Sequence, residues 1–112
     1  MGEASLKAEV WVKAQIRLCD LNTIPAMVVR RGDADAGAVY LKLNRFGDGC
    51  EVLAQVRAAD GRRAWMRGTG EAPVAEADAD AYLARQVAVD PDIWIIEIED
   101  ADGRYRVDGD IV

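Results

Sequence analysis

Two groups of side chains in this sequence have the residue types and spacing that binding or catalysis would use. The first is Arg30-Arg31-Gly32-Asp33-Ala34-Asp35, where two guanidinium groups and two carboxylates surround a glycine. Arginine beside free backbone N–H groups can hold a phosphate or a carboxylate, and an adjacent aspartate can act as a base. This corner supports the hypothesis of a small anion-binding protein or a carboxylate-based enzyme. In the competing interpretation Arg30 and Arg31 pair with Asp33 and Asp35 and only brace the loop.

The second group depends on the register of a hairpin that joins residues 50–57 to a strand returning through Trp65. Ala59-Asp60-Gly61 suits a three-residue loop with glycine in the left-handed conformation. This register pairs Gln55 with Trp65, and it is preferred because it keeps the arginines off the core face. A two-residue Asp60-Gly61 turn would exchange the faces of the returning strand.

The preferred register collects aromatic and basic residues on one sheet face, and strand order along the chain would add Tyr40. The predicted interface consists of Tyr40, Leu53, Arg57, Arg63, Trp65 and Arg67. Trp, Tyr and Arg dominate protein interfaces, so the first hypothesis is a non-catalytic interaction module that binds a protein partner or a second copy through Trp65. Arginine beside an aromatic ring can also bind single-stranded nucleic acid, but the net charge of −6 disfavours that alternative. Packing of Trp65 within its own chain is the third interpretation.

Several chemistries lack the residues they need. The chain has no histidine and a single serine, Ser5, so no Ser–His or Cys–His pair can form. The Asp-x-Asp pairs at Asp33 and Asp100 resemble the openings of calcium loops without the remaining ligands, and both fit turns. Two cysteines are too few for a structural zinc site. We therefore expect no metal and no cofactor.

Composition and charge favour one acidic domain in the cytoplasm. No apolar run approaches the roughly 20 residues of a membrane helix, and the first residues do not form a secretory signal. Cys19 and Cys50 are expected to be buried, reduced and unbonded. Residues 1–68 carry a net charge of +3 and residues 69–112 a net charge of −9, which suggests a basic and an acidic face.

The elements that would position these residues follow from hydrophobic periodicity. A helix over residues 5–22 begins at Ser5, with Leu6, Val10, Ala14, Leu18 and Leu21 along one side. Residues 25–45 predict a hairpin, residues 92–99 a central strand that is apolar on both faces, and Arg104 to Val107 a short final strand after an Asp102-Gly103 turn. Residues 73–88 form a second helix that begins at Pro73.

These elements give the order α-β-β-β-β-α-β-β in a single domain over residues 1–112. Because most connections are hairpins, we expect the α+β class, with a largely antiparallel sheet of five to six strands and two helices on one face.

Four segments resemble an uncharacterised family from alphaproteobacteria, domain of unknown function 1491. They are Leu6-Lys-Ala-Glu-Val-Trp-Val, Ile24-Pro-Ala-Met-Val-Val-Arg-Arg-Gly-Asp-Ala-Asp-Ala-Gly-Ala-Val, Ala81-Tyr-Leu-Ala-Arg and Asp90-Pro-Asp-Ile-Trp-Ile-Ile-Glu-Ile-Glu-Asp. The resemblance covers nearly the whole chain. It implies no activity and no catalytic residues, because the family has none assigned.

Overall fold

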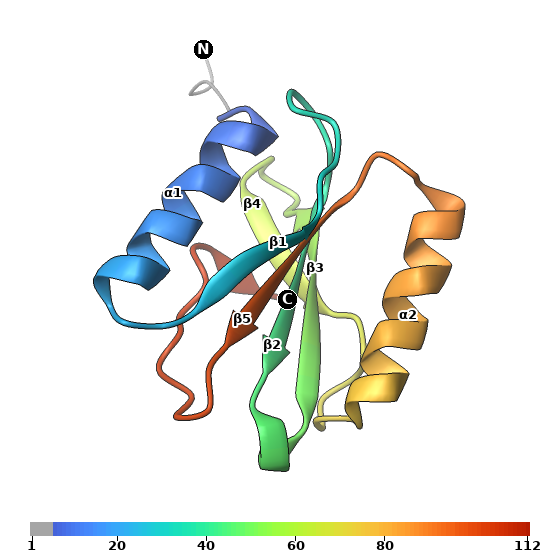
Figure 1. Ribbon diagram of the computed structural model, residues 1–112. Helices are drawn as coiled ribbons and strands as arrows, with labels where there is room; N and C mark the ends of the chain where they lie inside the picture. The colour runs from blue at the N-terminus through green and yellow to red at the C-terminus, as the bar shows by residue number, and fades with distance from the viewer. Residues whose placement is uncertain (1–5) are drawn as a thin grey trace.

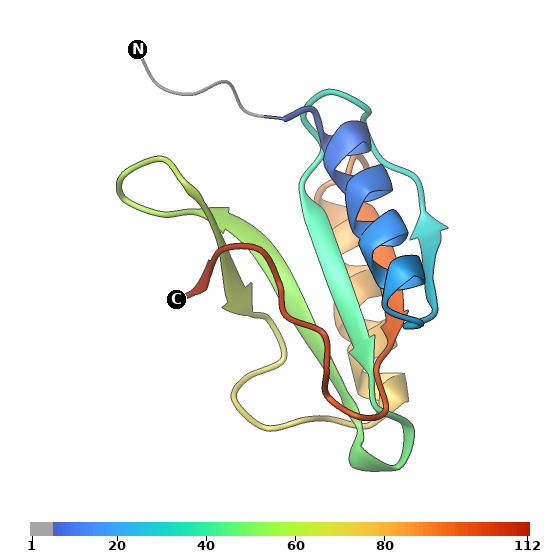
Figure 2. The ribbon, with the colours of Figure 1, turned by 90° about the vertical axis from the view of Figure 1, so that its left-hand side faces the viewer.

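The computed structural model describes residues 6–112 and shows one six-stranded sheet between two helices (Figure 1, Figure 2). The strand order across the sheet is β1-β5-β2-β3-β4-β6. The predicted α+β class is confirmed. The elements are α1 (Ala8–Leu21), β1 (Ala26–Arg30), β2 (Val39–Asn44), a short 3-10 turn (Phe46–Asp48), β3 (Cys50–Arg57), β4 (Arg63–Arg67), α2 (Glu76–Val89), β5 (Trp94–Glu99) and β6 (Asp110–Ile111).

The helices lie on opposite faces of the sheet, so the prediction that both cover one face is wrong (Figure 1). On the α1 side, Trp11 and Val12 pack with Leu41, Leu53 and other strand residues in one core. On the α2 side, Ala79 and Leu83 pack with Val52 and Ile95 in a second, smaller core. The central strands are apolar on both faces, and each face needs its own helix to exclude water.

The predicted hairpin over residues 25–45 does not form, because β5 lies between its two strands. β5 pairs antiparallel with β1 and parallel with β2, so the sheet is mixed, with three antiparallel and two parallel pairings. The loop between β1 and β2 passes close to the start of β5. A Cβ atom on Gly32 or Gly37 would lie 2.3 or 2.4 Å from the backbone oxygen of Asp92, so these glycines permit the close approach.

The predicted register of the β3–β4 hairpin is confirmed: Gln55 pairs with Trp65 and Val56 with Ala64. The prediction that Trp65 lies on an uncovered face is nevertheless wrong, since its side chain is 0% exposed. Helix α1 covers it, and the ring centroids of Trp11 and Trp65 are 5.3 Å apart. The register determines only the sheet face on which Trp65 lies. That face is covered by α1, while α2 covers the other face, so the predicted register and the burial of Trp65 are both correct.

The C-terminal segment does not return as a hairpin strand beside β5. Arg104 to Val107 forms no strand, and the chain crosses to the far edge, where β6 pairs parallel with β4 (Figure 2). Both carboxylate oxygens of Asp100 accept backbone N–H groups, from Arg104 at 2.8 Å and Tyr105 at 2.9 Å. The Tyr105 hydroxyl then donates to Gln15 of α1 at 2.9 Å, so burial of this tyrosine directs the chain under α1.

Helix α1 begins at Ala8, with Lys7 at its N-cap position, and the predicted Ser5 cap lies outside the described residues. Its core face also differs from the prediction. Trp11, Val12 and Cys19 are each 2% exposed, whereas the expected core residues Val10 and Leu18 are 49% and 51% exposed. Trp11 and Val12 fill the space over the sheet, and this places Val10 and Leu18 on the solvent side of α1.

Both cysteines are free, as predicted, and they belong to different cores: Cys19, on the inner face of α1, packs in the core on that side, and Cys50 packs in the core under α2. Neither helix of the described region has the length and apolarity that crossing a bilayer requires. The described residues also contain no group of three potential metal ligands. Cytoplasmic location and the lack of a cofactor stay predictions.

Candidate interaction surface

The corner at residues 30–35 does not bring its arginines and aspartates together. The Arg30 guanidinium donates to the Pro91 carbonyl at 2.7 Å. Arg31 forms an ion pair with Glu9 of α1, and its guanidinium carbon lies 5.2 Å from the centre of the Trp94 ring. Each arginine therefore ties the β1–β2 loop to a neighbouring element. The predicted pairing of Arg30 and Arg31 with Asp33 and Asp35 is not found among the described residues; both arginines contact other partners.

The two aspartates of this corner also have structural partners. One Asp33 oxygen accepts the backbone N–H groups of Asp35 at 3.2 Å and Ala36 at 2.8 Å, which is a turn stabilised by its own side chain. Asp35 forms an exposed ion pair with Lys7, with a separation of 3.5 Å. The four charged side chains of this corner thus each have their own partner among the described residues, and anion binding there stays a prediction.

The predicted Trp65 interface is divided between layers and is not one exposed surface. Leu53 and Trp65 belong to the core under α1. Tyr40 pairs with Ala54 and packs against the core under α2, where the centroids of the Tyr40 and Tyr82 rings are 6.3 Å apart. It therefore lies on the opposite face of the sheet from Trp65. Arg67 binds Glu51 at 2.9 Å at the end of the hairpin. Of the predicted set, only Arg57 and Arg63 line a common cleft.

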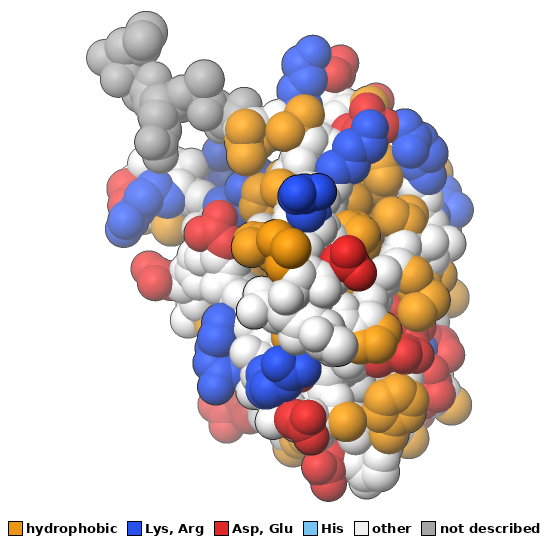
Figure 3. Space-filling view, turned by 60° about the vertical axis from the view of Figure 1, so that its left-hand side comes forward, with side chains coloured by type: hydrophobic (Ala, Val, Ile, Leu, Met, Phe, Trp, Pro, Cys, Tyr) orange, Lys and Arg blue, Asp and Glu red, His pale blue; other side chains and the backbone are white. Residues whose placement is uncertain are grey.

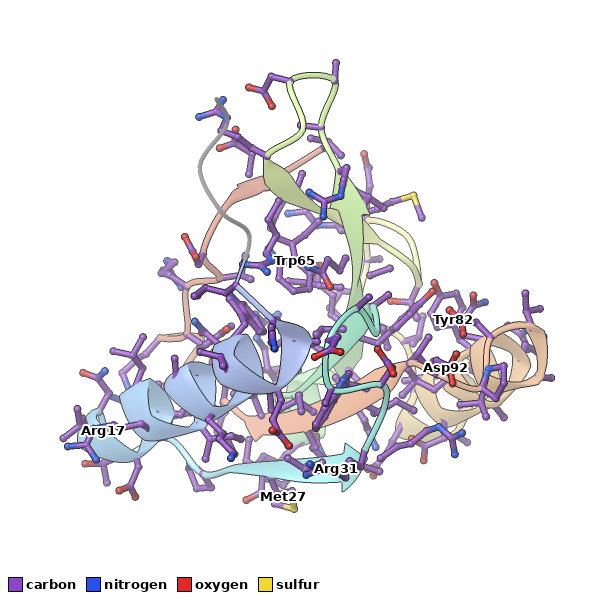
Figure 4. All side chains as sticks on the ribbon, turned by 90° about the horizontal axis from the view of Figure 1, so that it is seen from above. Arg17, Met27, Arg31, Trp65, Tyr82 and Asp92 are labelled. Atoms are coloured by element: carbon purple, nitrogen blue, oxygen red, sulfur yellow. The ribbon has the colours of Figure 1, made fainter. Side chains whose placement is uncertain are left out.

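A groove of about 560 Å³ runs between α1 and the edge strand β1. Its floor is apolar, and its lining includes Val12, Ile16, Ile24 and Trp94. Strand β1 forms the outer wall through Ala26 and Val28. In Figure 4, Arg17 lies on the α1 side, and Met27 and Arg31 lie on the β1 side. We call this feature the α1–β1 groove.

Charged residues form the rim of the α1–β1 groove. Glu9 joins Lys13 and Arg31 in ion pairs, and Arg17 and Asp20 stand further along the helix. Figure 3 shows hydrophobic side chains on this face of the molecule interspersed with basic and acidic ones. An apolar floor with a charged rim is the usual composition of a surface that binds another protein.

Strand β1 offers unpaired backbone groups along the groove. The Glu99 N–H donates to the Pro25 carbonyl at 2.8 Å, so these two residues form a hydrogen-bonded pair. Because such pairs alternate in an antiparallel ladder, the N–H and C=O groups of Ala26 and Val28 point away from β5. Strand β1 is the first strand of the sheet order and has no second neighbour among the described residues. Its outer side can therefore accept another strand.

The exposed side of β1 is also apolar. Met27, Val28 and Val29 are 44%, 45% and 56% exposed. The sequence predicted this run as the first strand of a hairpin over residues 25–45, and its position at the edge of the sheet was not predicted. One signal was present, since Pro25 immediately precedes the strand and proline is favoured at strand starts and on edge strands.

The comparisons with known proteins agree with the family resemblance. The model of the family described as "Protein of unknown function (DUF1491)" matches residues 6–108. The chain belongs to this family. The crystal structure of a DUF1491 family protein from Caulobacter crescentus CB15 is 38% identical, covers 96% of this chain and 100% of its own, and has a TM-score of 0.85. An NMR structure of a DUF1491 protein from the same organism is 38% identical, covers 98% and 99%, and has a TM-score of 0.83.

A more distant structure shows only the same fold. The solution structure of protein Atu0922 from A. tumefaciens is 24% identical, covers 86% of each chain, and has a TM-score of 0.73. The comparison with functionally curated proteins gave no match. The family therefore fixes the fold and leaves the function to be argued from the surface.

Proposed function

We propose that this protein is a non-catalytic interaction module that binds an extended segment of a protein partner along β1. The observation that supports this proposal is the free edge of β1, which presents outward backbone groups and three exposed apolar residues beside the α1–β1 groove. An added strand would pair with Ala26 and Val28, and alternate side chains would enter the groove. Strand addition of this kind takes affinity from backbone hydrogen bonds and specificity from side-chain pockets.

The geometry of β1 limits the length of the added strand. Proteins usually protect sheet edges with proline, charge or bulges. Here Pro25 precedes β1, and the pairing with β5 shifts between Val28 and Arg30, so only a short stretch stays regular. A segment of a few residues fits this stretch, and the apolar floor of the groove favours hydrophobic side chains at alternate positions.

The test uses a proline at the outward-pointing position Val28. Val28→Pro removes an N–H that β5 does not use, so the sheet should stay intact while strand addition loses a hydrogen bond and meets a steric block. Val28→Thr is the matched control, because it keeps the backbone N–H and the β-branched shape. The measurement is affinity capture from native lysate with wild type, Val28→Pro and Val28→Thr as baits, followed by quantitative mass spectrometry.

We expect a specific protein to be retained by wild type and by Val28→Thr and to be lost with Val28→Pro. Circular dichroism and thermal unfolding should show that the proline variant is folded. Equal retention by a folded Val28→Pro variant would reject strand addition at β1. If the retained protein is the chain itself, sedimentation of the purified variants distinguishes self-association from binding of a different partner.

A further inference from the structure

A cleft at the end of α1 opposite the α1–β1 groove carries two arginines, Arg57 and Arg63, that have no ion-pair partner within residues 6–112. The cleft has a volume of about 780 Å³ and lies between the tip of the β3–β4 hairpin, the start of α1 and the segment just before β6. Arg57 and Arg63 both line it. They are direct cross-strand partners in the hairpin, so their charges stand side by side. Like charges at opposed positions of two strands destabilise a hairpin, and their pairing here calls for an explanation.

The remaining contacts of these two side chains hold them in place without neutralising them. One Arg57 nitrogen donates to the Gly61 carbonyl at 2.9 Å. The Arg63 guanidinium lies over Trp11, 5.0 Å from the ring centre, and its buried Nε has no hydrogen-bond acceptor among the described residues. Burial, and to a smaller degree the charge of Arg57, lower the pKa of Arg63, although Asp108 opposes this shift. Arg63 is thus a half-buried cation that the ring of Trp11 holds in place.

The acidic residues of the cleft leave the arginine pair available. Asp35 pairs with Lys7, and Asp60 pairs with Arg62 at 2.7 Å. Asp108 and Asp110 also line the cleft, but within residues 6–112 neither comes within ion-pair distance of Arg57 or Arg63. Lys7 and Arg62 also line the cleft, but their charges pair with Asp35 and Asp60, so Arg57 and Arg63 are the two basic lining residues left without an ion pair within residues 6–112.

We infer that Arg57 and Arg63 form a binding site for a small oxyanion, a phosphate or carboxylate group that their two guanidinium groups hold together. A bridging oxyanion converts the repulsion between the arginines into two charge-assisted hydrogen-bonded contacts. This site is independent of the α1–β1 groove and of the proposed strand addition.

The test is a titration of the full-length protein followed by the arginine Nε–Hε signals in NMR and by the melting temperature. Sodium phosphate and sodium succinate are compared with sodium chloride at equal ionic strength. We expect saturable shifts of the Arg57 and Arg63 signals and a rise in melting temperature with phosphate, or with succinate if the natural ligand is a carboxylate. Removal of one charged hydrogen-bonding partner should weaken binding about tenfold or more.

Three variants decide the outcome. Arg57→Gln removes an exposed charge and should raise Kd by the stated factor. Arg63→Lys keeps the charge but lacks the planar fork, so it should also weaken binding. Arg67→Gln, on the same hairpin but outside the cleft, should bind as wild type does. Shifts that chloride reproduces, or a Kd that Arg57→Gln leaves unchanged, would overturn the proposal.

Discussion

Lys42 is a charged residue in the layer between the sheet and α2. Its side chain is 6% exposed, and its ammonium group lies 2.7 Å from Glu76, 2.8 Å from Asp80 and 3.5 Å from Glu97. Burial alone would lower the pKa of Lys42, but hydrogen bonds to Asp80 and Glu76 and the charge of Glu97 raise it overall. Lys42 therefore connects the first turns of α2 to the centre of the sheet.

Removal of this ammonium group should be costly. Lys42→Met preserves much of the side-chain volume but leaves Glu97, whose side chain is 17% exposed, without its cation. Removal of one partner of a buried ion pair lowers the free energy of unfolding by about 3–5 kcal/mol. Because Glu76 and Asp80 are partly exposed, we expect Lys42→Met to lower it by about 3 kcal/mol or less. Urea unfolding at pH 7 measures the effect.

The double variant separates charge from packing. Lys42→Met with Glu97→Gln removes the unpaired buried charge, so it should recover part of the lost free energy of unfolding. The free energy of unfolding of the double variant is compared with those of the single variants Lys42→Met and Glu97→Gln. If the two single losses simply add, Lys42 acts through packing and not through its charge on Glu97.

At the scale of elements, α1 carries apolar residues on two sides. One side packs on the sheet, and the other exposes Val10, Leu18 and Leu21. Two valines distinguish these sides with the same chemical change. Val12 is 2% exposed and Val10 is 49% exposed. Val12→Ala should cost about 2 kcal/mol of unfolding free energy, because it removes two buried methyl groups and leaves a cavity.

Val10→Ala should change the unfolding free energy by less than about 0.5 kcal/mol, because alanine regains helix propensity while little buried area is lost. Thermal and urea unfolding of the two variants, made in the same background, test this difference. A larger loss for Val10→Ala than for Val12→Ala would show that the helix is rotated relative to the described packing.

Local patterns predicted some elements well and their neighbours poorly. The alternation of residues 50–57 and the glycine of Ala59-Asp60-Gly61 encode the β3–β4 register, because the turn and the strands are adjacent in the sequence. The position of β5 between β1 and β2 depends on contacts that join residue 26 to residue 98. No local sequence pattern indicates a pairing between residues so far apart. Two apolar runs around a polar loop have the same sequence pattern whether the two strands pair directly or a third strand lies between them.

The candidate surfaces illustrate the same limit at single residues. Trp65 carries the signature of an interface residue, yet the free face that it needed is occupied by α1. Arg57 and Arg63 were predicted on one face, and the structure does place them together in one cleft. The α1–β1 groove could not be predicted, because it exists only once α1 and β1 are placed on β5.

For the whole molecule, the proton-releasing groups with shifted pKa values predict sensitivity to alkaline conditions. Burial raises the pKa of Cys19, Cys50, Tyr40, Tyr82 and Tyr105, and the carboxylates around Lys42 raise its pKa in spite of burial. In each case the folded state keeps a proton that the unfolded chain releases. The stability is therefore complete below the ordinary pKa values and decreases as pH rises above about 9.

Each such group contributes about 1.4 kcal/mol per pH unit between its unfolded and folded pKa values. Urea unfolding at several pH values between 7 and 11 should show a progressive loss of free energy. Tyr105→Phe should cost about 1 kcal/mol at pH 7, through loss of the hydrogen bond to Gln15, and should reduce the slope above pH 10. An unchanged slope in this variant would exclude Tyr105 as a contributor.

The central place of β5 also has a consequence for the nascent chain. β1 and β2 leave the ribosome early, but the strand that separates and pairs them ends at Glu99. At about 5–20 residues per second, synthesis from the end of β2 at Asn44 to Glu99 takes roughly 3–11 s. During this interval the apolar sides of α1, β1 and β2 have no completed sheet to cover them. Much of the sheet can therefore close only after β5 has been synthesised, and until then β1 and β2 can pair with other chains.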